Sequence, residues 1–141
     1  MSEATATVVG MGVEYVNPEG MLVSRAFSQA VVVSNPTKTI YVGAQMPQDS
    51  TGALVGKGDM RAQTVQVLAN LKAVLEACGA GIEHVIHWTI YVVPGHDIMP
   101  AVEEAMRWLA GRTEPPLNTV VSVPGFPGSE ALLSIEATAV L

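Results

Sequence analysis

The chain has little charge and almost no cysteine. Only 14% of its 141 residues are charged, and Cys78 is the single cysteine. An average domain has about 25% charged residues. We therefore expect part of the surface to be covered by further copies of the same chain. One cysteine excludes an internal disulfide and a cysteine-rich zinc site.

Basic residues and long apolar runs are also scarce. Seven scattered Lys and Arg stand against thirteen acidic residues, for a net charge of -6. A nucleic-acid-binding surface gathers its bases on one face, so this class is disfavoured. Residues 1–10 lack the pattern of a secretory signal, and no apolar run approaches the ~20 residues that span a bilayer. We expect one cytoplasmic domain over residues 1–141, with residues 1–19 as an N-terminal extension and no membrane partner.

Two helices are predicted. One lies between Asp59, a side chain that can cap its start, and Gly79, which can end it. The other runs from Asp97 to about Leu109, with a proline in its first turn. Apolar residues at helical spacing form the buried stripe of the first helix: Val67, Leu68, Leu71, Val74, Leu75 and Cys78. Cys78 is interpreted as inert packing on this stripe.

Alternation of period two predicts strands at 84–93 and 132–141, with further strands at 29–33, 39–42 and 118–123 and a hairpin region near 21–24. In the first of these, Ile86, Trp88, Ile90 and Val92 are expected on the buried side. Two helices cover only one face of five or six strands, so the prediction is a two-layer α+β domain with one open sheet face. Residues expected on that face are Tyr91, Val120, His87, Thr89, Ser122, Glu136 and Thr138.

Metal and cofactor motifs are not found. The glycine-rich segment from Gly52 to Gly58 lacks the spacing and the Ser or Thr of a phosphate loop. His84 and His87 are three residues apart in a predicted strand, so they point to opposite faces and cannot share one ion. We therefore expect neither a metal nor a cofactor, and we interpret the histidines as structural or interface residues.

Glu136 is the carboxylate that needs an explanation, because it lies inside a predicted strand between Ile135 and Ala137. Solvent on an exposed face, or an ion pair across an interface, would account for it. A functional alternative is a carboxylate in a small pocket that moves a proton or orients a water molecule.

Several segments in order make the chain resemble the Rid family, the reactive intermediate deaminases also called the YjgF-like or L-PSP endoribonuclease family. The resemblance covers about residues 20–141. It rests on the segments 27–31 (FSQAV), 41–47 (YVGAQMP), 70–79 (NLKAVLEACG), 91–92 (YV) and 135–137 (IEA).

The resemblance implies a chorismate-mutase-like fold and a homotrimer with a small-molecule cleft at each subunit interface. Family members of the best-known type hydrolyse enamines and imines to 2-oxo acids and ammonia without metal or cofactor. By the same resemblance, Glu136 corresponds to the glutamate that positions water, and an arginine two residues after a proline binds the substrate carboxylate.

The chain departs from that pattern at the arginine. The corresponding residues read Pro116-Leu117-Asn118-Thr119, so Asn118 stands in the arginine's place. Phe27 stands where the family often has tyrosine, Ala44 where it often has glycine, and Val120 where some members have cysteine. The implied substrate-binding residues are Asn118, Phe27, Ala44, Thr119 and Val120, and Arg25 is a candidate to supply the missing positive charge.

Three functions remain open. The first is a cofactor-free imine or enamine deaminase whose substrate is altered by Asn118. The second is a trimeric ligand-binding or regulatory protein that performs no chemistry. The third, endoribonuclease activity, is disfavoured by the acidic balance and the scattered bases.

Overall fold

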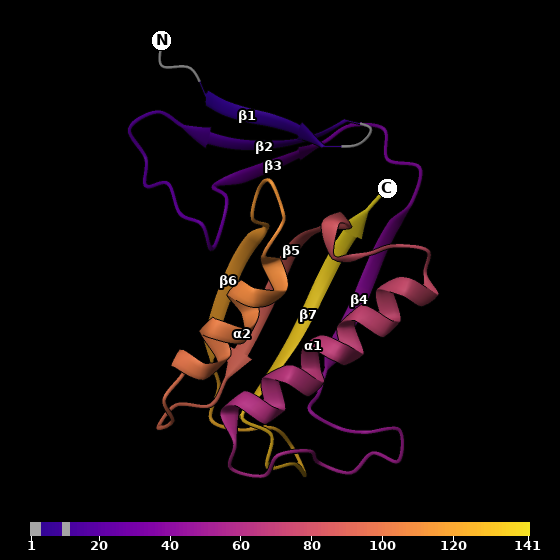
Figure 1. Ribbon diagram of the computed structural model, residues 1–141, viewed down its shortest axis with the longest axis vertical. Coiled ribbons are helices and arrows are strands. Elements are labelled where there is room, and N and C mark those ends of the chain that lie inside the picture. The colour runs from indigo at the N-terminus through magenta and orange to yellow at the C-terminus, as the bar shows by residue number, and fades with distance from the viewer. Residues whose placement is uncertain (1–3, 10–11) are drawn as a thin grey trace.

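The structure is a computed structural model that describes residues 4–9 and 12–141. In chain order its elements are β1 (Ala4–Val9), β2 (Val13–Pro18), β3 (Ala30–Val33), β4 (Thr39–Gln45), α1 (Met60–Ala77), a short 3₁₀ helix (Ile82–His84), β5 (Val85–Val92), α2 (Met99–Leu109), β6 (Leu117–Ser122) and β7 (Leu133–Val140). Figure 1 shows their arrangement.

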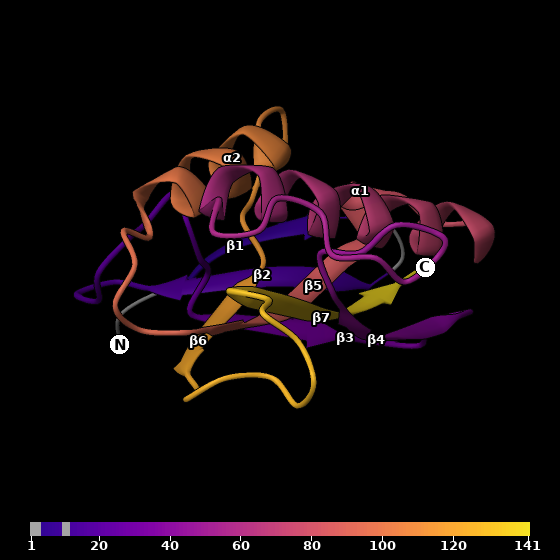
Figure 2. The ribbon, with the colours of Figure 1, turned by 90° about the horizontal axis from the view of Figure 1, so that it is seen from below.

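The strands of the described residues form two sheets. A four-stranded sheet has the order β4-β7-β5-β6, with β5 and β6 parallel and the other pairs antiparallel. Both helices lie on the same side of this sheet (Figure 2). An antiparallel β1-β2-β3 sheet lies across its end (Figure 1). The predicted α+β class, with two helices on one face of a mixed sheet, is confirmed.

The strands are divided differently from the expected sheet of about six. Residues 4–9 and 13–18, which the prediction left as an extension, form β1 and β2. After β3 the chain turns through Asn35, which has a φ of 52°, and Pro36. Proline cannot donate to a strand ladder. The turn therefore separates β3 from β4, and the two strands belong to different sheets.

Local signals place α1 where the sequence predicts it. The Asp59 side chain accepts a hydrogen bond from the Ala62 amide at 3.0 Å. Gly79, with a φ of 81°, follows the last turn in the left-handed conformation that glycine adopts at little cost. Val67, Leu71 and Leu75 are fully buried against the sheet.

The predicted sidedness of β5 is wrong at its start. A bulge in the pairing with β7 lies between Val85 and His87. It shifts the alternation by one residue, so Val85 packs in the helix-facing core while Ile86 packs against the cluster of the three-stranded sheet. From Trp88 onward the prediction is correct. The Trp88 ring is buried and stacks on Trp108 with a centroid distance of 5.4 Å.

Arg112 joins the two sheets. Its guanidinium donates to the Tyr15 hydroxyl at 2.9 Å and to the carbonyls of Ile82 and Val85 at 2.8 Å each. It also donates to the Glu114 carbonyl at 3.0 Å. Tyr15 is 2% exposed, so this junction is a buried part of the fold.

Among the described residues, no helix has both the length and the apolar content that a bilayer crossing requires.

Candidate functional site

Glu136 lies on the sheet face that the helices leave open. It pairs with Thr89 across the β5–β7 ladder. Its Oε1 accepts a hydrogen bond from the Tyr91 hydroxyl at 2.8 Å. The two side chains are diagonal neighbours, which long side chains can bridge. This hydrogen bond is the main cause of a raised pKa of Tyr91, and burial raises the pKa further. The phenol therefore stays protonated and continues to donate.

Other polar side chains surround this pair. A hollow of about 240 Å³ is lined by Tyr41, His87, Thr89, Glu136 and Thr138 among others. His87 Nε2 and Thr119 Oγ1 are joined by a hydrogen bond of 3.1 Å. We call this group, Glu136 with Tyr91, His87, Thr89, Thr119 and Thr138, the open-face cluster. The predictions that Glu136, Thr89, Tyr91, His87 and Thr138 share the open face are confirmed.

Asn118 does not join the cluster within one chain. The parallel register of β5 and β6 places Trp88 opposite Asn118 and Thr89 opposite Thr119. Directly opposed residues share a face, and neighbours along a strand alternate. Asn118 therefore faces the helices together with Trp88, on the side of the sheet away from Glu136.

The same register corrects two further assignments. Val120 lies opposite Ile90 and Ser122 opposite Val92, so both belong to the helix-facing side rather than to the open face. Val120 lines a cavity there together with Asn118. The strand β6 is shifted by one residue relative to the pairing assumed from the sequence, and this shift exchanges the two faces.

The remaining predicted site residues are dispersed in the chain. Phe27 is half-buried in the loop before β3, which Ser28 ties to the start of β6 through a 2.6 Å bond from its hydroxyl to the Pro115 carbonyl. Ala44 is exposed on β4, the edge strand farthest from β6. Arg25 is exposed and lines a separate hollow beside Arg112.

Sequence reasoning assigned no role to Tyr91 or Trp88. The signal for Tyr91 was present, because the alternation of β5 places Tyr91 on the open face. Glu136 of the neighbouring strand β7 lies on the same face. The signal for Trp88 required the β5–β6 register, since only the register places its indole beside Asn118.

Comparisons with known proteins give consistent results. The family model for endoribonuclease L-PSP matches residues 20–141. A RutC family protein of Pyrococcus horikoshii is 34% identical over 80% of this chain and 85% of its own length. A 2-iminobutanoate/2-iminopropanoate deaminase of Dermatophagoides farinae is 30% identical over 82% of this chain and 85% of its own length.

The structural comparison extends to residues before the family match. The crystal structure of the Rid-family protein YyfB from Yersinia pestis superposes with a TM-score of 0.82 and 35% identity, covering 93% of this chain and 100% of that one. The family match, the related sequences and this fold together show that the chain belongs to the Rid family, also known as the YjgF-like or L-PSP endoribonuclease family.

Proposed function

We propose that this protein is a cofactor-free hydrolase of imines or enamines in which Glu136 is the catalytic carboxylate. The observation that carries the proposal is the hydrogen bond between Tyr91 and Glu136 on an uncovered sheet face. It holds one carboxylate oxygen in place, and the other oxygen is available for a water molecule. The deaminase name of a relative with 30% identity supports the reaction class.

The reaction needs one proton acceptor that can also return the proton. An enamine first tautomerises to its imine by gaining a proton at carbon and losing one from nitrogen. A water oxygen then bonds to the imine carbon as the C=N electrons move to nitrogen. Glu136 accepts a proton from this water and delivers it to the nitrogen, which gives a neutral carbinolamine. Transfer of the hydroxyl proton to the nitrogen breaks the C–N bond, forms the carbonyl and releases ammonia.

The substrate should differ from the carboxylate-bearing imines that the family arginine binds. An asparagine offers one neutral hydrogen bond where a guanidinium offers two charge-assisted ones. With about 1 kcal/mol for the neutral bond and about 1.5 to 3 for each of the two charged ones, the loss is roughly 2 to 5 kcal/mol. This corresponds to a binding of the carboxylate that is weaker by roughly thirtyfold to several thousandfold. We therefore propose a neutral or differently shaped substrate.

The active cleft in this proposal is formed between copies of the chain in a homotrimer. Glu136 and Asn118 lie on opposite faces of one sheet. A shared cleft therefore has to combine the open-face cluster of one subunit with the β6 edge of a neighbour. The low charged fraction, 14%, is consistent with extensive contact between subunits.

Kinetics with two substrates test the proposal. The decay of 2-aminoacrylate and of an acyclic N–H imine without a carboxylate, benzophenone imine, would be followed with and without protein. We expect faster decay of benzophenone imine to ketone and ammonia, and about a hundredfold or greater loss of this acceleration in Glu136→Gln. Glu130→Gln is the matched control, because Glu130 is an exposed carboxylate in a surface ion pair with Lys57. Equal rates with the parent protein and Glu136→Gln would contradict the proposal.

The second candidate function is a ligand-binding protein without catalysis. The observation in its favour is that Asn118 and Glu136 line different hollows of the described chain, on opposite faces of the sheet. The Asn118→Arg variant separates the candidates. Only the Asn118→Arg variant would then accelerate the decay of 2-aminoacrylate, and the parent protein would accelerate the decay of neither substrate. This result would show that the parent protein binds ligands without turning them over.

A further inference from the structure

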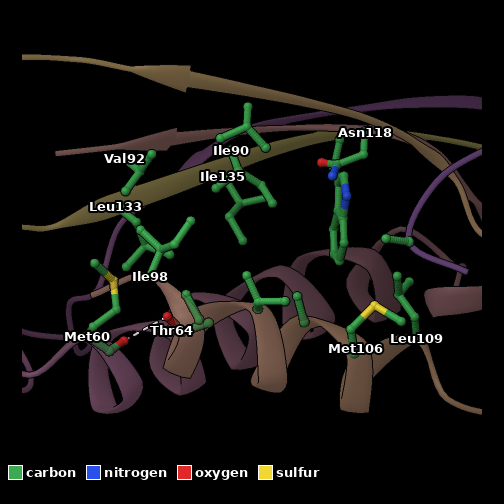
Figure 3. A pocket seen from close by; sticks show the side chains of 16 residues that line it. Met60, Thr64, Ile90, Val92, Ile98, Met106, Leu109, Asn118, Leu133 and Ile135 are labelled. Carbon is green, nitrogen blue, oxygen red and sulfur yellow. Dashed lines mark hydrogen bonds between the residues drawn. The ribbon is translucent and has the colours of Figure 1, made fainter. Parts of the chain in front are cut away.

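The two faces of the four-stranded sheet carry hollows of different character. On the helix-facing side, Figure 3 shows side chains of the sheet, such as Ile90 and Leu133, facing side chains of the helices, such as Met106. None of the described residues that line this first hollow has an ionisable side chain. The hollow of about 240 Å³ on the open face contains the carboxylate of Glu136. Charge therefore decides which ligands the open-face hollow accepts.

Glu136 has no positively charged partner in the described part of the chain. None of the ion pairs there includes Glu136, and neither Lys nor Arg lines its hollow. Its Oε1 accepts a hydrogen bond from the neutral Tyr91 hydroxyl, and no described side chain donates to Oε2. A carboxylate gains more from a charged donor than from a neutral one. The half-buried Glu136 is therefore suited to a cationic ligand.

The neighbouring strands leave room beside this carboxylate. A bulge in β4 places Gly43 and Ala44 opposite Glu136. A methyl group added at Gly43 would meet no other atom within 4 Å. On the other side, Thr89 of β5 is paired with Glu136 and lines the same hollow. A small group can therefore approach Oε2 between the small residues of β4 and the threonine of β5.

A row of three side chains crosses the sheet next to Glu136. Tyr41 of β4 and His87 of β5 are both paired with Thr138 of β7, and all three line the hollow. The face of a tyrosine ring attracts cations. The Thr138 hydroxyl oxygen can accept a hydrogen bond from an N–H group. The row therefore adds two further groups that favour a positive ligand with N–H donors.

We propose that the open-face hollow binds the substrate as an iminium cation, in which the imine nitrogen carries an additional proton. This inference rests on the proposed function and specifies the charge of the substrate. One N–H of the iminium group donates to Oε2 of Glu136, an oxygen that can also accept from the attacking water. The other N–H donates to the hydroxyl of Thr89 or Thr138. A carboxylate ligand would be repelled by Glu136 and would find no Lys or Arg among the described lining residues.

The cationic form also suits the reaction. A water oxygen bonds to the iminium carbon while the C=N electrons move to nitrogen, which becomes a neutral amine. Glu136 takes one proton from this water and returns it to the nitrogen. The C–N bond then breaks and its electrons leave with ammonia, while the hydroxyl oxygen forms the carbonyl and its proton joins the ammonia. Iminium and water thus give carbonyl and ammonium, and the charge balances.

Three small probes of the same shape test the charge preference. At pH 8 acetamidinium is a cation that resembles the iminium group, acetamide is neutral and acetate is an anion. Binding is measured from the backbone amide peaks of Thr89 and Glu136 in ¹H–¹⁵N spectra at constant ionic strength. We expect saturable movement with acetamidinium, about tenfold weaker binding of acetamide and no saturable shift with acetate.

Variants of similar shape test the groups that recognise the charge. Glu136→Gln should remove the preference, so that acetamidinium binds no more tightly than acetamide. Thr138→Val removes one acceptor and should weaken acetamidinium binding about fivefold. Glu130→Gln is the matched control, because Glu130 is an exposed carboxylate paired with Lys57. It should bind acetamidinium as the parent protein does.

The cation site and the proposed function can fail separately. Acetamidinium binding needs no turnover, so a parent protein that binds acetamidinium and hydrolyses no imine would keep the cation site and lose the deaminase activity. Hydrolysis of benzophenone imine that depends on Glu136, without saturable acetamidinium binding, would overturn the cation site alone. Acetate that binds as tightly as acetamidinium, or an acetamidinium shift that is unchanged in Glu136→Gln, would also overturn it.

Discussion

At the scale of single residues, Tyr91 and Asn118 show how one strand ladder separates two kinds of chemistry. Tyr91 donates to Glu136 on the open face. Asn118 lies beside Trp88 on the helix face, where a buried indole occupies the position across the ladder. The residue that replaces the family arginine therefore stands in an apolar environment that suits a neutral side chain and disfavours a charged one.

Removal of the Tyr91 hydroxyl tests its role as a positioning residue for Glu136. In Tyr91→Phe the Glu136 carboxylate loses the hydrogen bond that holds it in place. We expect kcat for imine hydrolysis to fall about tenfold or more, with little change in KM. Thermal unfolding is measured in parallel. A drop in Tm without a drop in kcat would assign Tyr91 a structural role only.

At the scale of elements, two carboxylates of α2, Glu103 and Glu104, accept hydrogen bonds from Arg61 of α1 and join the helices. Glu104 of α2 accepts hydrogen bonds from Arg61 of α1 at 2.8 Å and from Arg107 at 2.7 Å. The Glu104 side chain is only 10% exposed. These hydrogen bonds hold the pKa of Glu104 below its ordinary value of 4.5, and the bond from Arg61 has the largest effect. Burial acts in the opposite direction.

The direction of this shift predicts how stability depends on pH. A carboxyl group whose pKa is lowered by folding contributes stability above its unfolded pKa, and the contribution is lost as pH falls through the folded value. The free energy of unfolding should therefore decrease below about pH 4.5, and Glu104→Gln should show a shallower decrease. Urea unfolding at pH 3 to 7 measures both. Glu130→Gln, which removes an exposed carboxylate, should retain the parent's slope.

At the scale of the whole molecule, Arg112 connects the three-stranded sheet to the helix-covered sheet. Burial lowers the pKa of its guanidinium, and the Tyr15 hydroxyl acts in the opposite direction. The fork of donors on one planar group reaches three carbonyls and one hydroxyl, which an ammonium group cannot match.

Graded variants at this junction test the connection. Tyr15→Phe removes one hydrogen bond from a charged donor and should lower the free energy of unfolding by about 1.5 kcal/mol. Arg112→Lys leaves several buried carbonyls unpaired and should cost about 3 kcal/mol. Both are measured by urea unfolding. Equal losses in the two variants would show that the Tyr15 hydroxyl alone holds the junction.

The proposed trimer is a prediction at the same scale. Sedimentation equilibrium should give three times the 14.8 kDa mass of one chain. Several apolar side chains of the described residues are exposed in the single chain, among them Leu22, Val23 and Tyr41 at 70%, 73% and 82%. Contact between copies would cover such groups. A stable single subunit at micromolar concentration would contradict the trimer and the shared cleft.

Much of this molecule could be predicted from local signals in the sequence. Asp59 and Gly79 bound α1 because caps act within one helical turn. The alternation from Leu133 to Ala139 identified the buried side of β7, and it singled out Glu136 as a carboxylate on the other side. Each of these signals depends on residues that are close together in the chain.

Tertiary structure alone decided the features that depend on register. The pairing of β6 with β5, two strands joined through α2, placed Asn118 with Trp88 and away from Glu136. A bulge exchanged Val85 and Ile86, and the donors of Arg112 found acceptors far away in the sequence. A shift of one residue leaves a strand's pattern of alternation intact but turns every side chain to the other face. The sequence therefore determined which residues alternate, and packing between distant strands determined which of them meet.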